Sequence, residues 1–102
     1  MGGFVRVASL AALPPGSLAG VEVEGHGICL ANADGVVYAF ADNCSHQDHP
    51  LHTGTLEDGR LECAWHGAQF DPATGRAVRL PAIRKITTYE VRVEGDDILV
   101  AL

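Results

Sequence analysis

The sequence predicts an all-β domain, a sandwich or a barrel-like sheet. Turn signals recur at short, fairly even intervals, and the space between them suits strands and not helices. These signals are Pro14-Pro15-Gly16, Gly25-His26-Gly27, Asp34-Gly35, Asp58-Gly59, Asp71-Pro72, Thr74-Gly75 and Gly95-Asp96. The chain has 102 residues, 47% of them hydrophobic and 20% charged, which is enough for the core of one domain.

Runs rich in β-forming residues fill the spaces between the turns. The clearest is Ile86 to Glu94, where Tyr89, Val91 and Val93 alternate with polar residues at the period of a half-buried strand. The others, in chain order, are Phe4–Val7, Val21–Glu24, Gly27–Ala31, Val36–Phe40, Arg60–Cys63, Ala68–Phe70 and Asp97–Leu102. Several are joined by Asp-Gly or Glu-Gly-Asp turns, which suit hairpins. We expect a single domain over residues 1–102, with an inserted subdomain at about residues 43–79 that holds the possible metal ligands.

The charge balance limits the possible partners. Thirteen carboxylates against seven Lys and Arg give a formal net charge of -6, which argues against nucleic acid and anionic membranes and favours a basic protein surface. The longest uncharged run, Val7 to Val21, contains Pro14-Pro15 and is too short to span a bilayer. A lone Arg6 before a short apolar stretch makes a poor secretory signal, and three cysteines are too few for a disulfide scaffold. We therefore expect a reducing, cytoplasmic location.

Two short clusters carry the chemistry. Cys44-Ser45-His46 and Cys63-Ala64-Trp65-His66 each offer one thiolate and one imidazole. If the two loops lie side by side, the sulfurs can meet at one point and the imidazoles at another. That arrangement suits a [2Fe–2S] cluster with two Cys on one iron and two His on the other.

The sequence resembles the Rieske family along nearly its whole length. Family-like residues follow both clusters and close the chain: Gln47, Pro50-Leu51, Gly54, Gly67, Phe70-Asp71, Thr74-Gly75 and the run Tyr89 to Asp96. The resemblance implies a Rieske fold in which Cys44 and Cys63 hold the buried iron while His46 and His66 hold the outer iron near the surface. It also implies one cluster per chain, with the exposed histidines as the exit for the electron.

The similar soluble proteins are ferredoxin components of aromatic-ring dioxygenase systems. The resemblance therefore implies a monomeric one-electron carrier, without catalytic activity of its own, between a flavoprotein reductase and a terminal oxygenase. The alternative is a Rieske-type subunit of another redox enzyme, such as the small subunit of a nitrite reductase. Those subunits usually lack the four ligands, and an oxygenase's own Rieske domain precedes a much longer catalytic domain.

Other interpretations of the same residues are weaker. Two Cys and two His could bind a tetrahedral zinc ion, but the rest of the chain has no zinc-module character. Cys63 and His66 could form a nucleophilic pair, but nothing supplies an oxyanion site. A third possibility is that the cysteines are plain core thiols and the histidines surface residues, which would make four ligand-like positions a coincidence.

Four further residues are candidates for a metal site or a structural role. Cys29, between Ile28 and Leu30, is expected to be a small core residue. Asp48, His49 and His52 could suggest a facial-triad iron site, but the loop is short and a solvent-facing or partner-facing role is expected.

Other features near the clusters are also interpreted from the sequence. His26, between two glycines, is expected in a turn, and Trp65 is expected to pack near the cluster. Asp48, Glu57, Asp58, Glu62 and Asp71 are expected to form an acidic rim around His46 and His66.

Departures from the family predict a low redox potential. Respiratory Rieske proteins carry two further cysteines that bridge the two loops, but His49 and Trp65 stand there in this chain, so packing and hydrogen bonds must hold the loops. Those proteins also place a serine and a tyrosine where Ala68 and Phe70 stand, and both hydroxyl donors are therefore missing. We expect a potential near the roughly -150 mV end of the Rieske range and not the end near about +300 mV.

Overall fold

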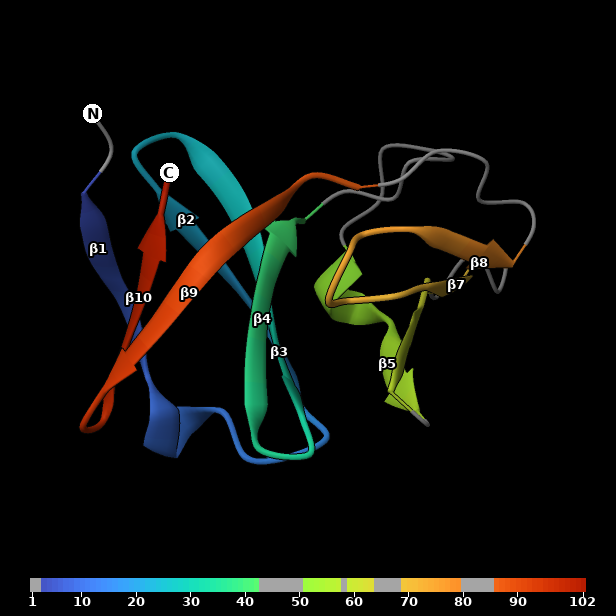
Figure 1. The fold of residues 1–102 in the computed structure, drawn as a ribbon, viewed down its shortest axis with the longest axis horizontal. Coiled ribbons are helices and arrows are strands. Elements are labelled where there is room, and N and C mark those ends of the chain that lie inside the picture. Colours follow the sequence, from blue (N-terminus) through green and yellow to red (C-terminus); the bar gives the residue numbers. More distant parts are fainter. Residues whose placement is uncertain (1–2, 43–50, 58, 64–68, 80–85) are drawn as a thin grey trace.

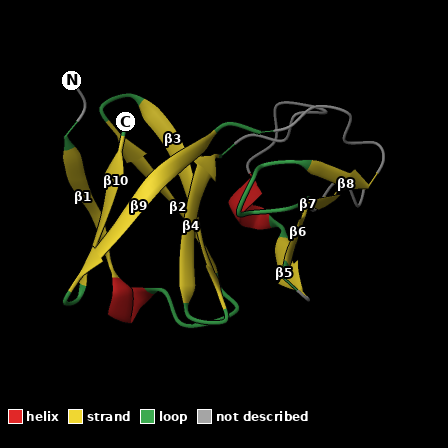
Figure 2. Ribbon diagram, in the orientation of Figure 1, coloured by secondary structure: helices red, strands yellow, loops and turns green. Residues whose placement is uncertain are grey.

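The structure, a computed structural model, describes residues 3–42, 51–57, 59–63, 69–79 and 86–102. Within these residues the predicted all-β class is confirmed, since strands in two antiparallel sheets make up the regular structure apart from two short 3₁₀ turns (Figures 1 and 2). No helix in the described part of the chain is long and apolar enough to cross a membrane.

The larger sheet has six strands in the order β1-β10-β9-β4-β3-β2. Their bounds are β1 Phe4–Ser9, β2 Leu18–Val23, β3 His26–Ala33, β4 Val36–Ala41, β9 Thr88–Glu94 and β10 Asp97–Ala101. The two edge strands, β1 and β2, come into contact, so the sheet curves into a nearly closed barrel. The 3₁₀ turn η1, Leu10–Ala12, connects these two edges along the chain.

The smaller sheet has four strands in the order β5-β6-β7-β8 and lies between β4 and β9 in the sequence. It consists of β5 Thr55–Glu57, β6 Arg60–Glu62, β7 Gln69–Phe70 and β8 Ala77–Arg79, and the 3₁₀ turn η2, Leu51–Thr53, leads into it. Figure 2 shows the small sheet at one side of the barrel, next to β3 and β4.

The barrel hairpins close through tight turns that require positive φ. Glu24-Gly25 and Asp34-Gly35 have positive φ at both residues, the pattern of type I′ turns, which match the twist of antiparallel strands. The prediction of a turn at Gly25-His26-Gly27 was wrong by one position. His26 is the first residue of β3 and pairs with Val23, because the turn consists of Glu24 and Gly25, which both have positive φ.

Two apolar clusters share the wall formed by β3 and β4. In β3, Ile28 and Leu30 face the barrel core, while Cys29 and Ala31 face a second cluster that includes Leu61 of the small sheet. Because both faces of β3 are buried, this strand is a continuous apolar run instead of an alternating one. The small sheet is thus fixed to the barrel by hydrophobic packing.

Candidate metal centre

Cys63 is the one candidate ligand that lies within the described residues. It directly follows β6, an inner strand of the small sheet that pairs with β5 and β7, and only 2% of its surface is exposed. Cys44, His46 and His66 lie outside the described residues, as do Asp48, His49 and Trp65. The flanking strands therefore hold Cys63 at a fixed, buried position.

The described residues beside the two ligand segments share one buried cluster. Leu51 directly follows the segment 43–50, and Cys63 directly precedes the segment 64–68. Both belong to the cluster that also contains Phe40, Phe70 and Ile86. The two segments therefore extend from a common apolar base, and the chain fits a cofactor that draws ligands from both.

Cys29 lies in the same cluster but has a different character. Its side chain is fully buried, and burial together with the negative charge of Asp42 raises the pKa of its thiol far above the ordinary value. The thiol contacts the carbonyl oxygen of Leu30 at 3.8 Å. Because Cys29 is fully buried in β3 between Ile28 and Leu30, it is a core residue, which confirms the interpretation from the sequence.

His52 contacts a residue that the sequence analysis did not single out. Its backbone N–H donates to Asp42 Oδ1 at 2.8 Å, and its ring Nδ1 donates to Asp42 Oδ2 at 2.5 Å. The interpretation of His52 as a solvent-facing side chain was incomplete, since the ring is 40% exposed but held by this carboxylate. The sequence carries one signal of this contact, which is Gly20. An isolated glycine in a strand often marks the close approach of another group, and here that group is the ring of His52.

The described acidic residues do not gather around Cys63. Strand pairing puts Glu62 next to Cys63, where it accepts a hydrogen bond from Gln69 Nε2 at 2.9 Å. Glu57 and Asp71 lie at the other end of the small sheet, since Glu57 pairs with Arg60 and Asp71 follows Phe70. Glu57 and Asp71 therefore lie away from Cys63, but the rim was predicted around His46 and His66, which lie outside the described residues together with Asp48 and Asp58, so the rim stays a prediction.

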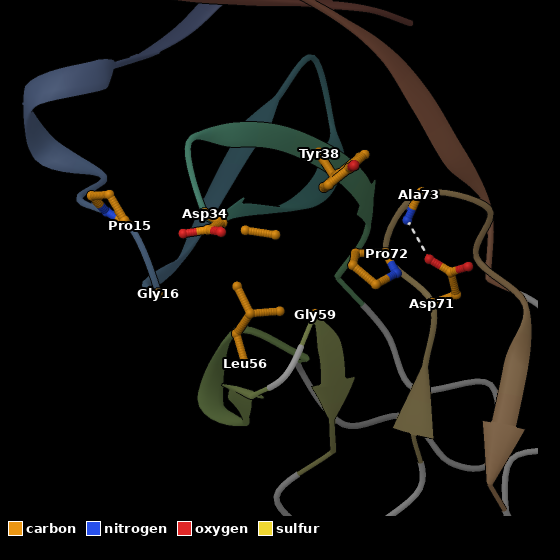
Figure 3. A pocket seen from close by; sticks show the side chains of 10 residues that line it. Pro15, Gly16, Asp34, Tyr38, Leu56, Gly59, Asp71, Pro72 and Ala73 are labelled. Atoms are coloured by element: carbon orange, nitrogen blue, oxygen red, sulfur yellow. Dashed lines mark hydrogen bonds between the residues drawn. The ribbon is translucent and has the colours of Figure 1, made fainter.

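A cleft of about 630 Å³ occupies that opposite end, between the small sheet and the turn joining β3 to β4 (Figure 3). It brings together Asp34, Tyr38, Leu56 and Asp71. The carboxylate of Asp71 accepts a hydrogen bond from the N–H of Ala73 at 3.0 Å. Because β6 runs from this end toward Cys63, the cleft lies away from Cys63, which does not line it.

Comparison with known proteins identifies relatives over nearly the whole chain. The chain is 40% identical over 99 residues to the biphenyl 2,3-dioxygenase ferredoxin component of Rhodococcus jostii, and the match covers 97% of this chain and 92% of the relative. The ferredoxin of carbazole 1,9a-dioxygenase from Nocardioides aromaticivorans is 35% identical, with a TM-score of 0.91 over 96% of both chains. A chain in the complex of reduced oxygenase and oxidised ferredoxin of carbazole 1,9a-dioxygenase is 27% identical, with a TM-score of 0.90 over 96% of this chain and 92% of that one.

The family assignment follows from a match that is independent of these individual relatives. Residues 3–90 match the model of the Rieske [2Fe-2S] domain. This span includes the barrel strands β1 to β4, the start of β9, the small sheet and both Cys/His clusters, and the family's cofactor is a Rieske-type [2Fe–2S] cluster. The chain belongs to the Rieske [2Fe–2S] domain family.

Proposed function

We propose that this protein is a one-electron carrier that takes electrons from a flavoprotein reductase and delivers them to a terminal ring-hydroxylating oxygenase. The observation that supports this most directly is the 40% identity with a dioxygenase ferredoxin component, because the match covers nearly all of both chains. The proposal includes that the protein has no catalytic activity of its own. Its role is to hold an electron and to present it to a partner.

Four residues are proposed to hold the cluster: Cys44 and Cys63 on the buried iron, and His46 and His66 on the outer iron. When bound, the cluster supplies a centre that accepts and releases one electron. The burial of Cys63 supports its assignment, since the apolar cluster around it excludes water from a ligand sulfur. The shared apolar base of both ligand segments supports the participation of the other three.

The proposed organisation is one domain over residues 1–102 with a cluster-binding subdomain at about residues 43–79. The position of β5 to β8 within that stretch supports this division. The barrel would then act as the base that holds the subdomain through β3 and β4.

Partner contacts are proposed at the end of the molecule that carries His46 and His66. The solved complex of a similar ferredoxin with its oxygenase supports a transient contact of this kind. A net charge of -6 favours a basic surface on each partner. We further propose a monomer in the cytoplasm.

The alternative, a small subunit of a nitrite reductase or of another redox enzyme, has less support. The relatives described above are ferredoxins of dioxygenase systems, and one of them is 40% identical over 97% of this chain. The presence of both Cys/His clusters also favours the carrier.

The test is the metal content of the purified protein. We expect a red-brown protein with about two irons and two acid-labile sulfides and the electron paramagnetic resonance (EPR) signal of a reduced cluster with mixed Cys and His ligation. The reduced protein should reoxidise on mixing with a ring-hydroxylating oxygenase. A colourless protein containing one zinc ion would contradict the proposal.

The ligand assignment is tested with two matched cysteine substitutions. Cys63→Ser should abolish or destabilise the cluster, because a serine is a poor substitute for a thiolate ligand at this site. Cys29→Ser should leave the visible spectrum unchanged, although it places a hydroxyl in a buried site. Loss of colour in the Cys29 variant alone would show that the assignment is wrong.

A further inference from the structure

Asp42 and His52 form a hydrogen-bonded pair that joins the two ends of the first ligand segment, residues 43–50. Asp42 directly precedes the segment, and His52 is the second residue after it. The carboxylate of Asp42 accepts from the backbone N–H of His52 at 2.8 Å and from its ring Nδ1 at 2.5 Å. One side chain thus binds both the backbone and the ring on the opposite end of the segment.

The barrel fixes both members of this pair. The N–H of Asp42 donates to the carbonyl of Gly27 in β3 at 3.0 Å, which extends the strand pairing by one residue. Leu51, next to His52, is fully buried in the cluster that contains Cys63. The side chain of Asp42 is itself only 11% exposed, so its carboxylate is largely shielded from water.

Gly20 of β2 provides the surface on which the ring of His52 rests. A Cβ at this position would lie 2.5 Å from Nδ1, 2.7 Å from Cγ and 2.9 Å from Cε1 of that ring. These three ring atoms are the nearest neighbours of such a Cβ, and the distances are shorter than real Cβ atoms show. The ring can therefore occupy this position only because residue 20 is glycine.

We propose that Asp42, His52 and Gly20 are positioning residues that fix the two ends of the first ligand segment relative to each other for cluster binding. The inference rests on the proposed function, because the segment supplies Cys44 and His46. Joining its two ends at one carboxylate reduces the conformational freedom that the segment would otherwise lose when the cluster binds. This role matters more in a chain without cysteines at the positions of His49 and Trp65, where no bridge between the loops can form.

The first experiment measures how fast an iron chelator removes the cluster. Asp42→Ala, His52→Ala and Gly20→Ala should each speed this loss about three- to fivefold, the effect of a charge-assisted hydrogen bond that is partly exposed. Gly3→Ala is the control for adding a methyl group at a glycine, since a Cβ at Gly3 would have no atom within 4 Å. His26→Ala is the control for an exposed histidine. Both controls should lose the cluster at the wild-type rate.

A double variant separates positioning by His52 from a general effect of Gly20. If the methyl group added by Gly20→Ala acts by displacing the ring, the double variant Gly20→Ala/His52→Ala should lose its cluster at the rate of His52→Ala alone. If instead the double variant loses its cluster at a rate raised by the product of the two single effects, the assignment of Gly20 is overturned. The EPR signal of the cluster should also shift in His52→Ala, whereas a role in overall stability alone would leave the signal of the folded protein unchanged.

Amide hydrogen exchange tests the pair of Asp42 and His52 directly, and the cluster content and release rate distinguish failure of this inference from failure of the proposed function. Amide hydrogen exchange at His52 should be faster in Asp42→Ala than in the wild type, because the N–H loses its acceptor. If the wild type binds no iron–sulfur cluster, the proposed function is wrong and the inference falls with it, whatever the exchange shows. If the wild type binds the cluster but the three single variants release it at the wild-type rate, only the inference is overturned.

Discussion

Phe70, the last residue of β7, is fully buried in the apolar cluster that contains Cys63. Its ring offers no hydrogen-bond donor to a ligand sulfur. A reduced cluster carries one more negative charge than an oxidised one, so each donor aimed at its sulfurs stabilises the reduced state and raises the potential. At the scale of the residue, the absence of a hydroxyl here favours a low potential.

Phe70→Tyr should therefore raise the midpoint potential. If about 1 kcal/mol of a hydrogen bond to a charged group differs between the redox states, one new donor raises a one-electron potential by about 40 mV. The measurement is a redox titration of the native protein and the variant, with iron content checked because an added hydroxyl can overpack a filled core. Phe4→Tyr is the control, since Phe4 lies in β1 of the barrel, where its ring contacts Arg92. A downward shift in Phe70→Tyr, or a native midpoint above about +100 mV, would contradict the explanation.

At the scale of the element, the packing of η2 against β6 depends on Gly54. A Cβ on Gly54 would lie 1.9 Å from the carbonyl oxygen of Glu62, the residue that ends β6 directly before Cys63. Gly54 also donates its N–H to the carbonyl of Leu51 at 3.0 Å, which closes the turn. The residues that follow η2 and the residue that precedes Cys63 are thus held together by a close backbone approach that leaves no room for a side chain at position 54.

Gly54→Ala should destabilise the fold by about 2 kcal/mol or more, because the obstacle is backbone and cannot rotate away. In thermal unfolding of the holo protein this corresponds to a decrease in Tm of about 10 °C for a domain of this size. Gly27→Ala, with open space around its Cβ beyond the contact to Asp42, should change Tm by no more than a few degrees. Equal Tm values for Gly54→Ala and the wild type would show that η2 and β6 can separate without cost.

The sequence predicts these elements unevenly, for physical reasons. Every predicted strand is present: alternation, as in Tyr89 to Val93, reflects one buried face, and the apolar run of β3 reflects burial on both faces. Strands β5 and β8 were missed; runs this short, including the predicted β6 and β7, show too little of a period for a reliable prediction. The pair of Asp42 and His52 was missed because it depends on how β4 and η2 meet in space, which no local pattern encodes.

At the scale of the whole molecule, the charge is spread over the surface. The oxidised cluster core adds +2 and its two thiolates -2, so the holo protein remains near -6 when oxidised and near -7 when reduced. Among the described acidic residues, Glu62 lies beside Cys63, whereas Asp71 and Asp34 line the cleft at the other end of the small sheet. Attraction to a basic partner is therefore expected from the net charge of the whole protein, to which acidic residues at both ends of the small sheet contribute.

Electron transfer to the oxygenase should slow as ionic strength rises. The Debye length falls from about 10 Å at 0.1 M to about 3 Å at 1 M, which screens the long-range attraction that brings the partners together. We expect the second-order rate constant in stopped-flow mixing to fall about tenfold or more over this range, since steering raises association rates by that factor or above. A rate constant that stays level would refute electrostatic steering.

Two single-charge variants test which acidic residue contributes more to the electrostatic attraction of a basic partner. Glu62→Gln and Asp71→Asn each remove one negative charge, the first beside Cys63 and the second at the cleft. If the partner docks at the end that carries the ligands, the loss of Glu62 lies closer to the incoming basic surface and should reduce the low-salt rate constant more than the loss of Asp71 does. Near 1 M salt the two variants should match the wild type, because screening then removes the contribution of either charge. A larger effect of Asp71→Asn at low salt would place the contact at the cleft instead of at the histidine ligands.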